Sequence, residues 1–89
     1  MADVSLDNLR KQIDDVDNEI ISLLAKRMEI VGKIGNHKKE KNMPLVDNNR
    51  WQLLIQSLLH NAEKLKLSKE LVKDVYDQIL KHALHIEEK

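Results

Sequence analysis

The fold is decided by residues 6–39, LDNLRKQIDDVDNEIISLLAKRMEIVGKIGNHKK, where apolar side chains recur at alternating steps of four and three residues. The positions of this register are Leu9, Ile13, Val16, Ile20, Leu23, Ile30 and Ile34. Such spacing is typical of an α-helix with one apolar face. A helix of this length would extend roughly 50 Å, which is longer than a compact domain of this size is wide. We therefore expect the helix to need a partner outside its own chain.

Two shorter helices are predicted after a loop at residues 40–45. Pro44 lies in this loop and lacks the amide hydrogen that a helix interior requires. Asp47 and Ser68 are residue types that favour the start of a helix, so we expect each to cap one. The apolar faces of the two helices consist of Trp51, Leu54, Ile55, Leu58, Leu59 and Ala62, and of Val72, Val75, Tyr76, Ile79, Ala83 and Ile86. The prediction is an all-α chain of three helices, the first very long.

The composition agrees with one helical domain over residues 1–89. Two glycines, one proline and no phenylalanine describe a chain with few turns. Because the first helix overshoots the other two, one chain alone buries little core. A homodimer that pairs two long first helices would supply the missing contacts.

Charge and composition exclude several functional classes. Basic and acidic residues number 15 each, so nothing calls for a nucleic-acid partner. The absence of cysteine excludes disulfides and thiolate chemistry, and it suits a reducing cytoplasm. No apolar run approaches the ~20 residues that cross a bilayer, and the N-terminus does not resemble a signal peptide. We expect a cytoplasmic protein without a membrane anchor.

Two cations interrupt the apolar stripe of the first helix. Arg27 fills the gap in the register and Lys38 continues the same stripe, which places them within roughly 20° of one another on a helical wheel. Their side chains can therefore share one small anion. The alternative is a buried ion pair or a snorkelling side chain, since Lys and Arg are seldom buried without a partner.

Two further arginines are candidates for the same anion. Arg50 lies at the start of the second helix, where free amides and the helix dipole favour an anion, although a solvated surface residue fits the position equally well. Arg10 lies ~25 Å before Arg27 along the helix, so it can reach the site only from a second chain. His82 and His85 have no third ligand at a supporting spacing, and we expect no metal and no organic cofactor.

Four motifs, in order, resemble the small all-helical class of chorismate mutase. They are Leu9-Arg10-x-x-Ile13-Asp14-x-x-Asp17, Leu23-Leu24-Ala25-x-Arg27, Ile34-Gly35-x-x-Lys38 and Pro44-x-x-Asp47-x-x-Arg50. The resemblance implies an intertwined helical-bundle homodimer with two active sites, each completed by an arginine from the other chain. It also implies the Claisen rearrangement of chorismate to prephenate, on the route to phenylalanine and tyrosine. A pericyclic step needs positioning and electrostatic stabilisation of a dianion rather than a nucleophile.

The same resemblance assigns roles to the cations and to one acid. Arg27 and the partner chain's Arg10 would clamp the two carboxylates, and Lys38 would donate to the ether oxygen and a carboxylate. Arg50 would add positive potential at the rim of the pocket, and Asp47 would contact the ring hydroxyl.

The resemblance also assigns a role to one residue of the last helix. A Gln or Glu there contacts the ether oxygen, and the position corresponds to Glu87. An ionised carboxylate cannot donate a hydrogen bond. We therefore expect that Glu87 works in its protonated form and that activity falls as pH rises. The alternative is a frayed terminal carboxylate.

Two other positions lose polar groups of the family's site. Ala83 takes the substrate-binding position of a serine, and Trp51 takes that of a glutamate beside the ring hydroxyl; we expect Trp51 to pack on Val46 as a hydrophobic staple. Both changes put substrate identity in question. The alternatives are an isochorismate-pyruvate lyase, an amino-chorismate mutase, or a non-catalytic helical dimerisation or regulatory module. Family members are also often fused to other enzymes of the aromatic pathway, so a fusion or partner enzyme is a further expectation.

Overall fold

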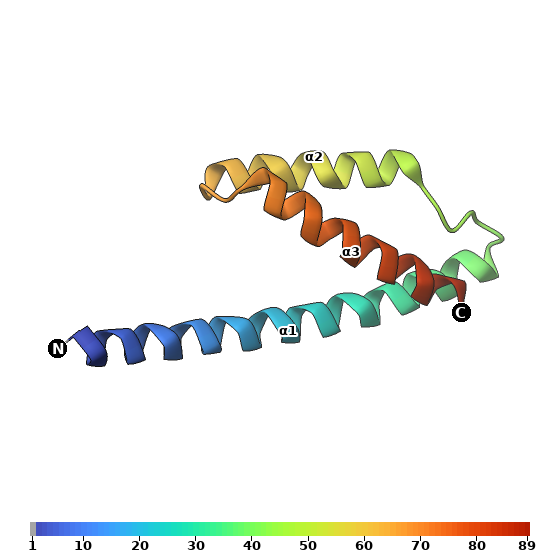
Figure 1. The fold of residues 1–89 in the computed structure, drawn as a ribbon. Helices are drawn as coiled ribbons and strands as arrows, with labels where there is room; N and C mark the ends of the chain where they lie inside the picture. The colour runs from blue at the N-terminus through green and yellow to red at the C-terminus, as the bar shows by residue number, and fades with distance from the viewer. Residues whose placement is uncertain (1) are drawn as a thin grey trace. The chain divides into compact units, whose positions relative to one another are not determined.

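The structure is a computed structural model that describes the backbone of residues 2–89 and the side chains of residues 5–89. These residues form three α-helices, α1 (Ala2–Glu40), α2 (Asn48–Lys64) and α3 (Lys69–Glu88) (Figure 1). The all-α prediction and its very long first helix are confirmed. Within the described range, no helix combines the length and the apolar character that a membrane span requires.

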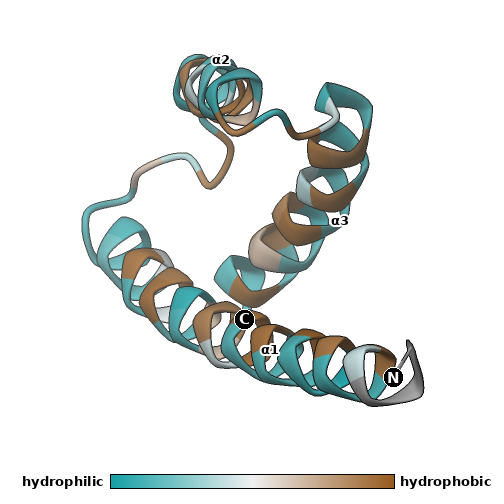
Figure 2. Cartoon of the chain, turned by 90° about the vertical axis from the view of Figure 1, so that its left-hand side faces the viewer, coloured by the Kyte–Doolittle hydropathy of each residue, from teal (hydrophilic) through white to brown (hydrophobic). Residues whose placement is uncertain are grey.

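The chain divides into two compact units, Met1–Ile30 and Val31–Lys89. In the first unit, the predicted apolar stripe of α1 is exposed to solvent; Ile13 is 60% exposed and Leu23 is 65% exposed. Figure 2 shows hydrophobic bands alternating with hydrophilic ones along α1. Folded monomers rarely leave a contiguous apolar surface of this extent in water. The stripe is therefore available for a contact outside this unit.

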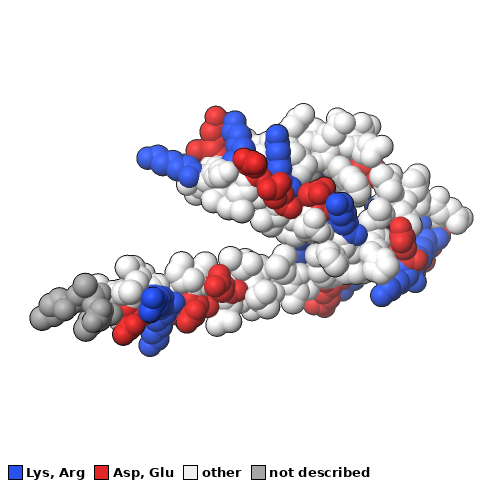
Figure 3. Space-filling view, viewed as in Figure 1, with Lys and Arg blue, Asp and Glu red and all other residues white. Residues whose placement is uncertain are grey.

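The second unit buries only small apolar side chains. Among the residues that the structure describes, the buried apolar ones are Val31, Ala62, Val72 and Ala83. Larger side chains such as Leu53, Leu65 and Leu71 stay more than 40% exposed. Figure 3 shows acidic and basic side chains mixed along α3. A core of alanines and valines contributes little hydrophobic stabilisation, because the free energy scales with the apolar area removed from water.

Side-chain caps start both shorter helices as predicted. The Asp47 carboxylate accepts a hydrogen bond from the Arg50 backbone amide at 3.0 Å, and Ser68 Oγ accepts one from the Leu71 amide at 3.2 Å. Each cap satisfies an amide that has no partner within its own helix. The two caps fix where α2 and α3 begin.

The ends of α1 and α2 share one backbone geometry. After α1, Asn42 adopts a left-handed conformation (φ 54°), and the Met43 amide donates to the Lys38 carbonyl at 2.8 Å. This is a Schellman motif, which closes the last turn of a helix. After α2, Lys66 adopts the same conformation (φ 58°). The motif at Asn42 anchors the backbone of Lys38 and turns the chain into the loop that carries Pro44.

Candidate functional site

The centre of the candidate site is an ion pair between the last turns of α1 and α3. Lys38 Nζ donates to Glu87 Oε1 at 2.9 Å and to the Leu45 carbonyl at 2.8 Å. The Glu87 side chain is 9% exposed and that of Lys38 is 18% exposed. The structure therefore brings together two predicted site residues that lie 49 positions apart in the sequence.

Glu87 belongs to an ordered part of the fold. It lies within α3, is buried, and is held by Lys38, so the alternative of a frayed terminal carboxylate does not describe it. The predicted chemistry requires this carboxyl in its protonated form, because only the acid can donate a hydrogen bond.

The Leu45 carbonyl is a partner of Lys38 that sequence reasoning missed. Every residue carries a backbone carbonyl, so no residue type signals which one accepts a hydrogen bond. The contact ties the loop between α1 and α2 to the end of α1. An ammonium has three N–H donors, and the two hydrogen bonds described leave Lys38 a third for a ligand.

A pocket of about 460 Å³ lies beside Lys38 and opens along this loop. Its lining residues are Lys38, Met43, Pro44, Val46, Asp47, Asn48 and Asn49. An ammonium, a carboxylate and two amides therefore meet in a space that lies within the range of small-molecule sites. Asp47 lines this pocket together with Lys38 and also caps α2, and its role toward a substrate stays a prediction.

Arg50 lies in the first turn of α2 and is exposed. Its backbone amide bonds to Asp47, but in the described part of the chain its side chain is not among those that line the pocket at Lys38. A contribution to the electrostatic potential at the rim does not require direct contact. The predicted role of Arg50 stays a prediction.

Arg10 and Arg27 both belong to α1 and to the first compact unit. Arg10 is exposed, whereas Arg27 is half-buried and its Nη1 atom is shielded from solvent. The predicted clamp on two carboxylates depends on both residues, and for Arg10 on a second chain. These roles also stay predictions.

Ala83 lies one helical turn before Glu87 on the same face of α3 and is 6% exposed. Its methyl group offers no hydrogen bond, so the predicted role of this position in substrate binding stays a prediction. The buried face of the last turn of α3 therefore presents Glu87 as its polar group.

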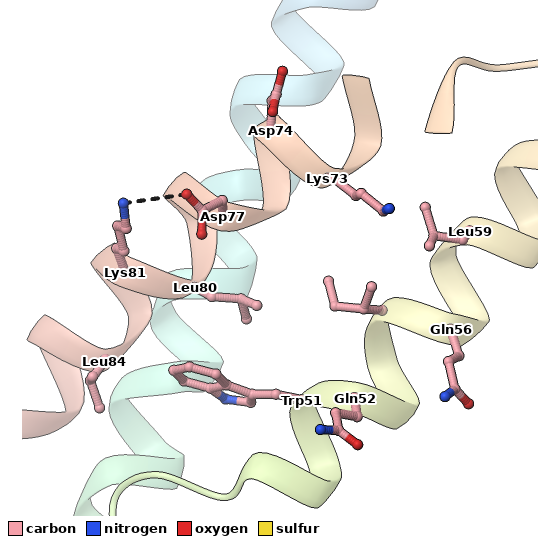
Figure 4. A pocket seen from close by; sticks show the side chains of 11 residues that line it. Trp51, Gln52, Gln56, Leu59, Lys73, Asp74, Asp77, Leu80, Lys81 and Leu84 are labelled. Atoms are coloured by element: carbon pink, nitrogen blue, oxygen red, sulfur yellow. Dashed lines mark ion pairs between the residues drawn. The ribbon is translucent and has the colours of Figure 1, made fainter. Parts of the chain in front are cut away.

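The space between α2 and α3 forms an open apolar groove of about 850 Å³. Trp51, Ile55 and Leu59 line it from α2, and Leu80 and Leu84 line it from α3 (Figure 4). An ion pair between Lys81 and Asp77 at 3.3 Å lies on the α3 side. The residues that line the groove from α2 belong to the apolar face that the sequence pattern predicts for this helix.

The sequence pattern did not predict the residues that line this groove from α3. Leu80 and Leu84 fall outside the predicted apolar face of α3, although their spacing of four residues is a usable signal. Trp51 is directed into the groove toward these leucines, whereas Val46 lines the pocket beside Lys38. The predicted staple between Val46 and Trp51 stays a prediction.

No group of three or more His, Cys, Asp or Glu side chains among the described residues is placed to hold a metal ion. His85 instead lies 4.0 Å from Glu88 on the last turn of α3.

Comparisons with known proteins identify the family. Residues 9–88 match the family described as chorismate mutase type II. The chain is 33% identical over 79 residues to the T-protein of Haemophilus influenzae, covering 89% of this chain and 21% of the relative. It is 30% identical over 88 residues to a bifunctional chorismate mutase/prephenate dehydratase of Buchnera aphidicola subsp. Acyrthosiphon pisum, covering 99% of this chain and 23% of the relative. The chain thus spans about a fifth of the length of these relatives, and it belongs to the chorismate mutase type II family.

Proposed function

We propose that this chain is a chorismate mutase domain that converts chorismate to prephenate in the biosynthesis of phenylalanine and tyrosine. The observation that carries the proposal is the buried contact of Lys38 with Glu87, because it joins an ammonium and a carboxyl at the positions that the family motif assigns to the ether oxygen. The family match over residues 9–88 supports it.

In the proposed mechanism the chain holds chorismate in its reactive conformer and stabilises charge on the breaking ether oxygen. The third N–H donor of Lys38 is directed to that oxygen and to a nearby carboxylate, while Leu45 and Glu87 fix the position of the ammonium. Protonated Glu87 donates a second hydrogen bond to the oxygen. Donors fixed before the reaction need no reorganisation as charge develops, which lowers the barrier.

The remaining polar groups are proposed to bind the rest of the substrate. Arg27 pairs with one carboxylate and Asp47 contacts the ring hydroxyl, in keeping with the place of each in the family motif. Arg50 raises the positive potential at the rim. Carboxylates are well held by arginine, because the planar guanidinium forms paired hydrogen bonds with a carboxylate.

We further propose that the active form is an intertwined homodimer. The exposed apolar stripe of α1 supports this, because each large aliphatic side chain that becomes buried contributes about 1.5–3 kcal/mol. The apolar groove between α2 and α3 offers a second surface of matching character. In this assembly the partner subunit's Arg10 completes the clamp on the substrate.

A second enzyme is proposed to use the product. The Buchnera relative is named for a mutase and a prephenate dehydratase together, and this chain matches about a quarter of it. We propose that this domain works in the cytoplasm beside such an enzyme, either fused to it or associated with it. Copurification of prephenate-consuming activity with the native protein tests this.

The proposed reaction is tested by chorismate disappearance with chromatographic identification of the product. The parent is expected to yield prephenate, whereas Arg27→Ala is expected to keep its helical content and lose turnover. Pyruvate release from isochorismate, with chorismate untouched, would assign the lyase instead. No turnover of either substrate would favour the non-catalytic module, in which the pair of Lys38 and Glu87 serves the fold.

A further inference from the structure

Gly35 of α1 lies so close to the last turn of α3 that no side chain fits between them. It is buried, and a Cβ atom placed on it would lie 2.9 Å from Glu87 Cα and 3.3 Å from the Glu87 carbonyl oxygen. Both atoms belong to the backbone, so a side-chain rotation does not relieve the conflict. The backbones of α1 and α3 are therefore in direct contact at this residue.

This contact sets the position of the Glu87 carboxyl. Gly35 and Lys38 are three residues apart, so they lie on the same face of α1. The close approach at Gly35 brings Glu87 level with Lys38, where its Oε1 accepts the hydrogen bond at 2.9 Å. A larger residue at position 35 would push the last turn of α3 away from Lys38.

We propose that Gly35 is a positioning residue that acts through Glu87. Its missing side chain lets α3 approach α1 closely enough to hold the carboxyl on Lys38 and toward the ether oxygen. This inference rests on the proposed function, because the carboxyl matters to turnover only if the chain rearranges chorismate.

Gly32 provides a matched control on the same helix. It lies one turn before Gly35, and nothing lies within 4 Å of a Cβ atom placed on it. Both glycines weaken a helix relative to alanine, so both alanine variants gain the same helix propensity. They differ in the contact with α3.

The test compares kcat of Gly35→Ala and Gly32→Ala, each in the parent and in a Glu87→Ala background. We expect Gly35→Ala to lower kcat by about 10²-fold in the parent, as a misplaced group of this kind does. In the Glu87→Ala background it should change kcat by less than about twofold, because no carboxyl remains to be displaced. Gly32→Ala should keep the parent kcat in both.

Two results would overturn the proposal. One is an equal loss of kcat from Gly35→Ala in both backgrounds, which marks a purely structural role. The other is a parent-like kcat in Gly35→Ala. If Gly35→Ala does not fold, the Gly32→Ala/Gly35→Ala chain adds helix propensity and repeats the test. Failure of that chain to fold also overturns the proposal, because the glycine then serves the fold.

A second measurement separates this inference from the proposed reaction. The ¹³C signal of the Glu87 carboxyl, assigned with Glu87→Gln, is expected to shift in Gly35→Ala and to stay in place in Gly32→Ala. If the parent does not rearrange chorismate while the signal still shifts in Gly35→Ala, the proposed function is rejected. The position of Glu87 would still depend on Gly35. An unshifted signal in Gly35→Ala contradicts the inference whatever the activity.

Discussion

At the scale of single residues, the proposed chemistry depends on the carboxyl of Glu87. Glu87 is 7% exposed, and it accepts a hydrogen bond from the Lys38 ammonium at 2.9 Å. Donation of a hydrogen bond to the ether oxygen requires the protonated acid, because an ionised carboxylate has no proton to donate.

We predict that the parent loses activity as pH rises and that Glu87→Gln does not. The ionised fraction of Glu87 grows with pH, so kcat/KM falls by up to about tenfold per pH unit once the carboxylate predominates. An amide donates at every pH, so the profile of Glu87→Gln should be flat over the same range. Profiles of kcat/KM for both proteins check this, and parallel profiles would show that another group controls the reaction.

At the scale of elements, the caps and turns fix both the helices and the site. Asp47 illustrates the overlap, because it caps α2 and also lines the pocket beside Lys38. Ser68 caps α3 without such a second role in the proposed chemistry.

We predict that Asp47→Ala and Ser68→Ala each lower the free energy of unfolding by about 1 kcal/mol, the usual loss for a helix cap. Asp47→Ala should in addition raise KM for chorismate, whereas Ser68→Ala should leave KM unchanged. Urea denaturation and steady-state kinetics measure the two effects. An unchanged KM in Asp47→Ala would remove Asp47 from the substrate site.

The left-handed residue that ends α2 gives a prediction about stability alone. Lys66 has φ 58°, a conformation that costs about 1–2 kcal/mol for residues with a Cβ atom. Lys66→Gly should therefore raise the free energy of unfolding by about 1 kcal/mol. Lys73→Gly lies inside α3 and should lower it by a similar amount. A loss of stability in Lys66→Gly would contradict this account of the helix end.

Much of the secondary structure could be predicted from the sequence, whereas the contacts between the helices and the loop could not. Periodicity and the cap residues Asp47 and Ser68 identified all three predicted helices, because these signals are local. The hydrogen bond from Lys38 to the Leu45 carbonyl had no such signal, since it depends on how the loop folds back. The contact of Gly35 with Glu87 depends in the same way on where α3 ends.

At the scale of the whole molecule, the exposed apolar stripe of α1 is the feature that calls for a partner outside the chain. The overlength of the helix was predicted from its register, and the exposure of residues such as Ile13 agrees with it. The residue that a second chain contributes to a site cannot be read from one chain's periodicity. For Arg10, its distance from Arg27 along the helix left only a site on a second chain, and the resemblance to the family supplied its role there.

We predict that Ile13→Asp converts the proposed dimer to monomers and abolishes turnover. A carboxylate in the interface would be buried without a partner, which is strongly unfavourable. Leu53→Asp is the matched control, because Leu53 is 64% exposed, close to the 60% of Ile13, but lies on α2 outside the groove. Sedimentation velocity and prephenate formation measure both properties. An active dimeric Ile13→Asp would place the interface elsewhere.

The most direct test of the central claim, a chorismate site shared between two copies, is complementation between two inactive variants. Arg10→Ala and Lys38→Ala are each expected to be inactive alone. Mixed by unfolding and refolding together, they should regain about a quarter of the parent's prephenate formation, because half of the dimers are mixed and each has one intact site. A mixture that stays as inactive as its components, beside an active parent, would contradict the shared site.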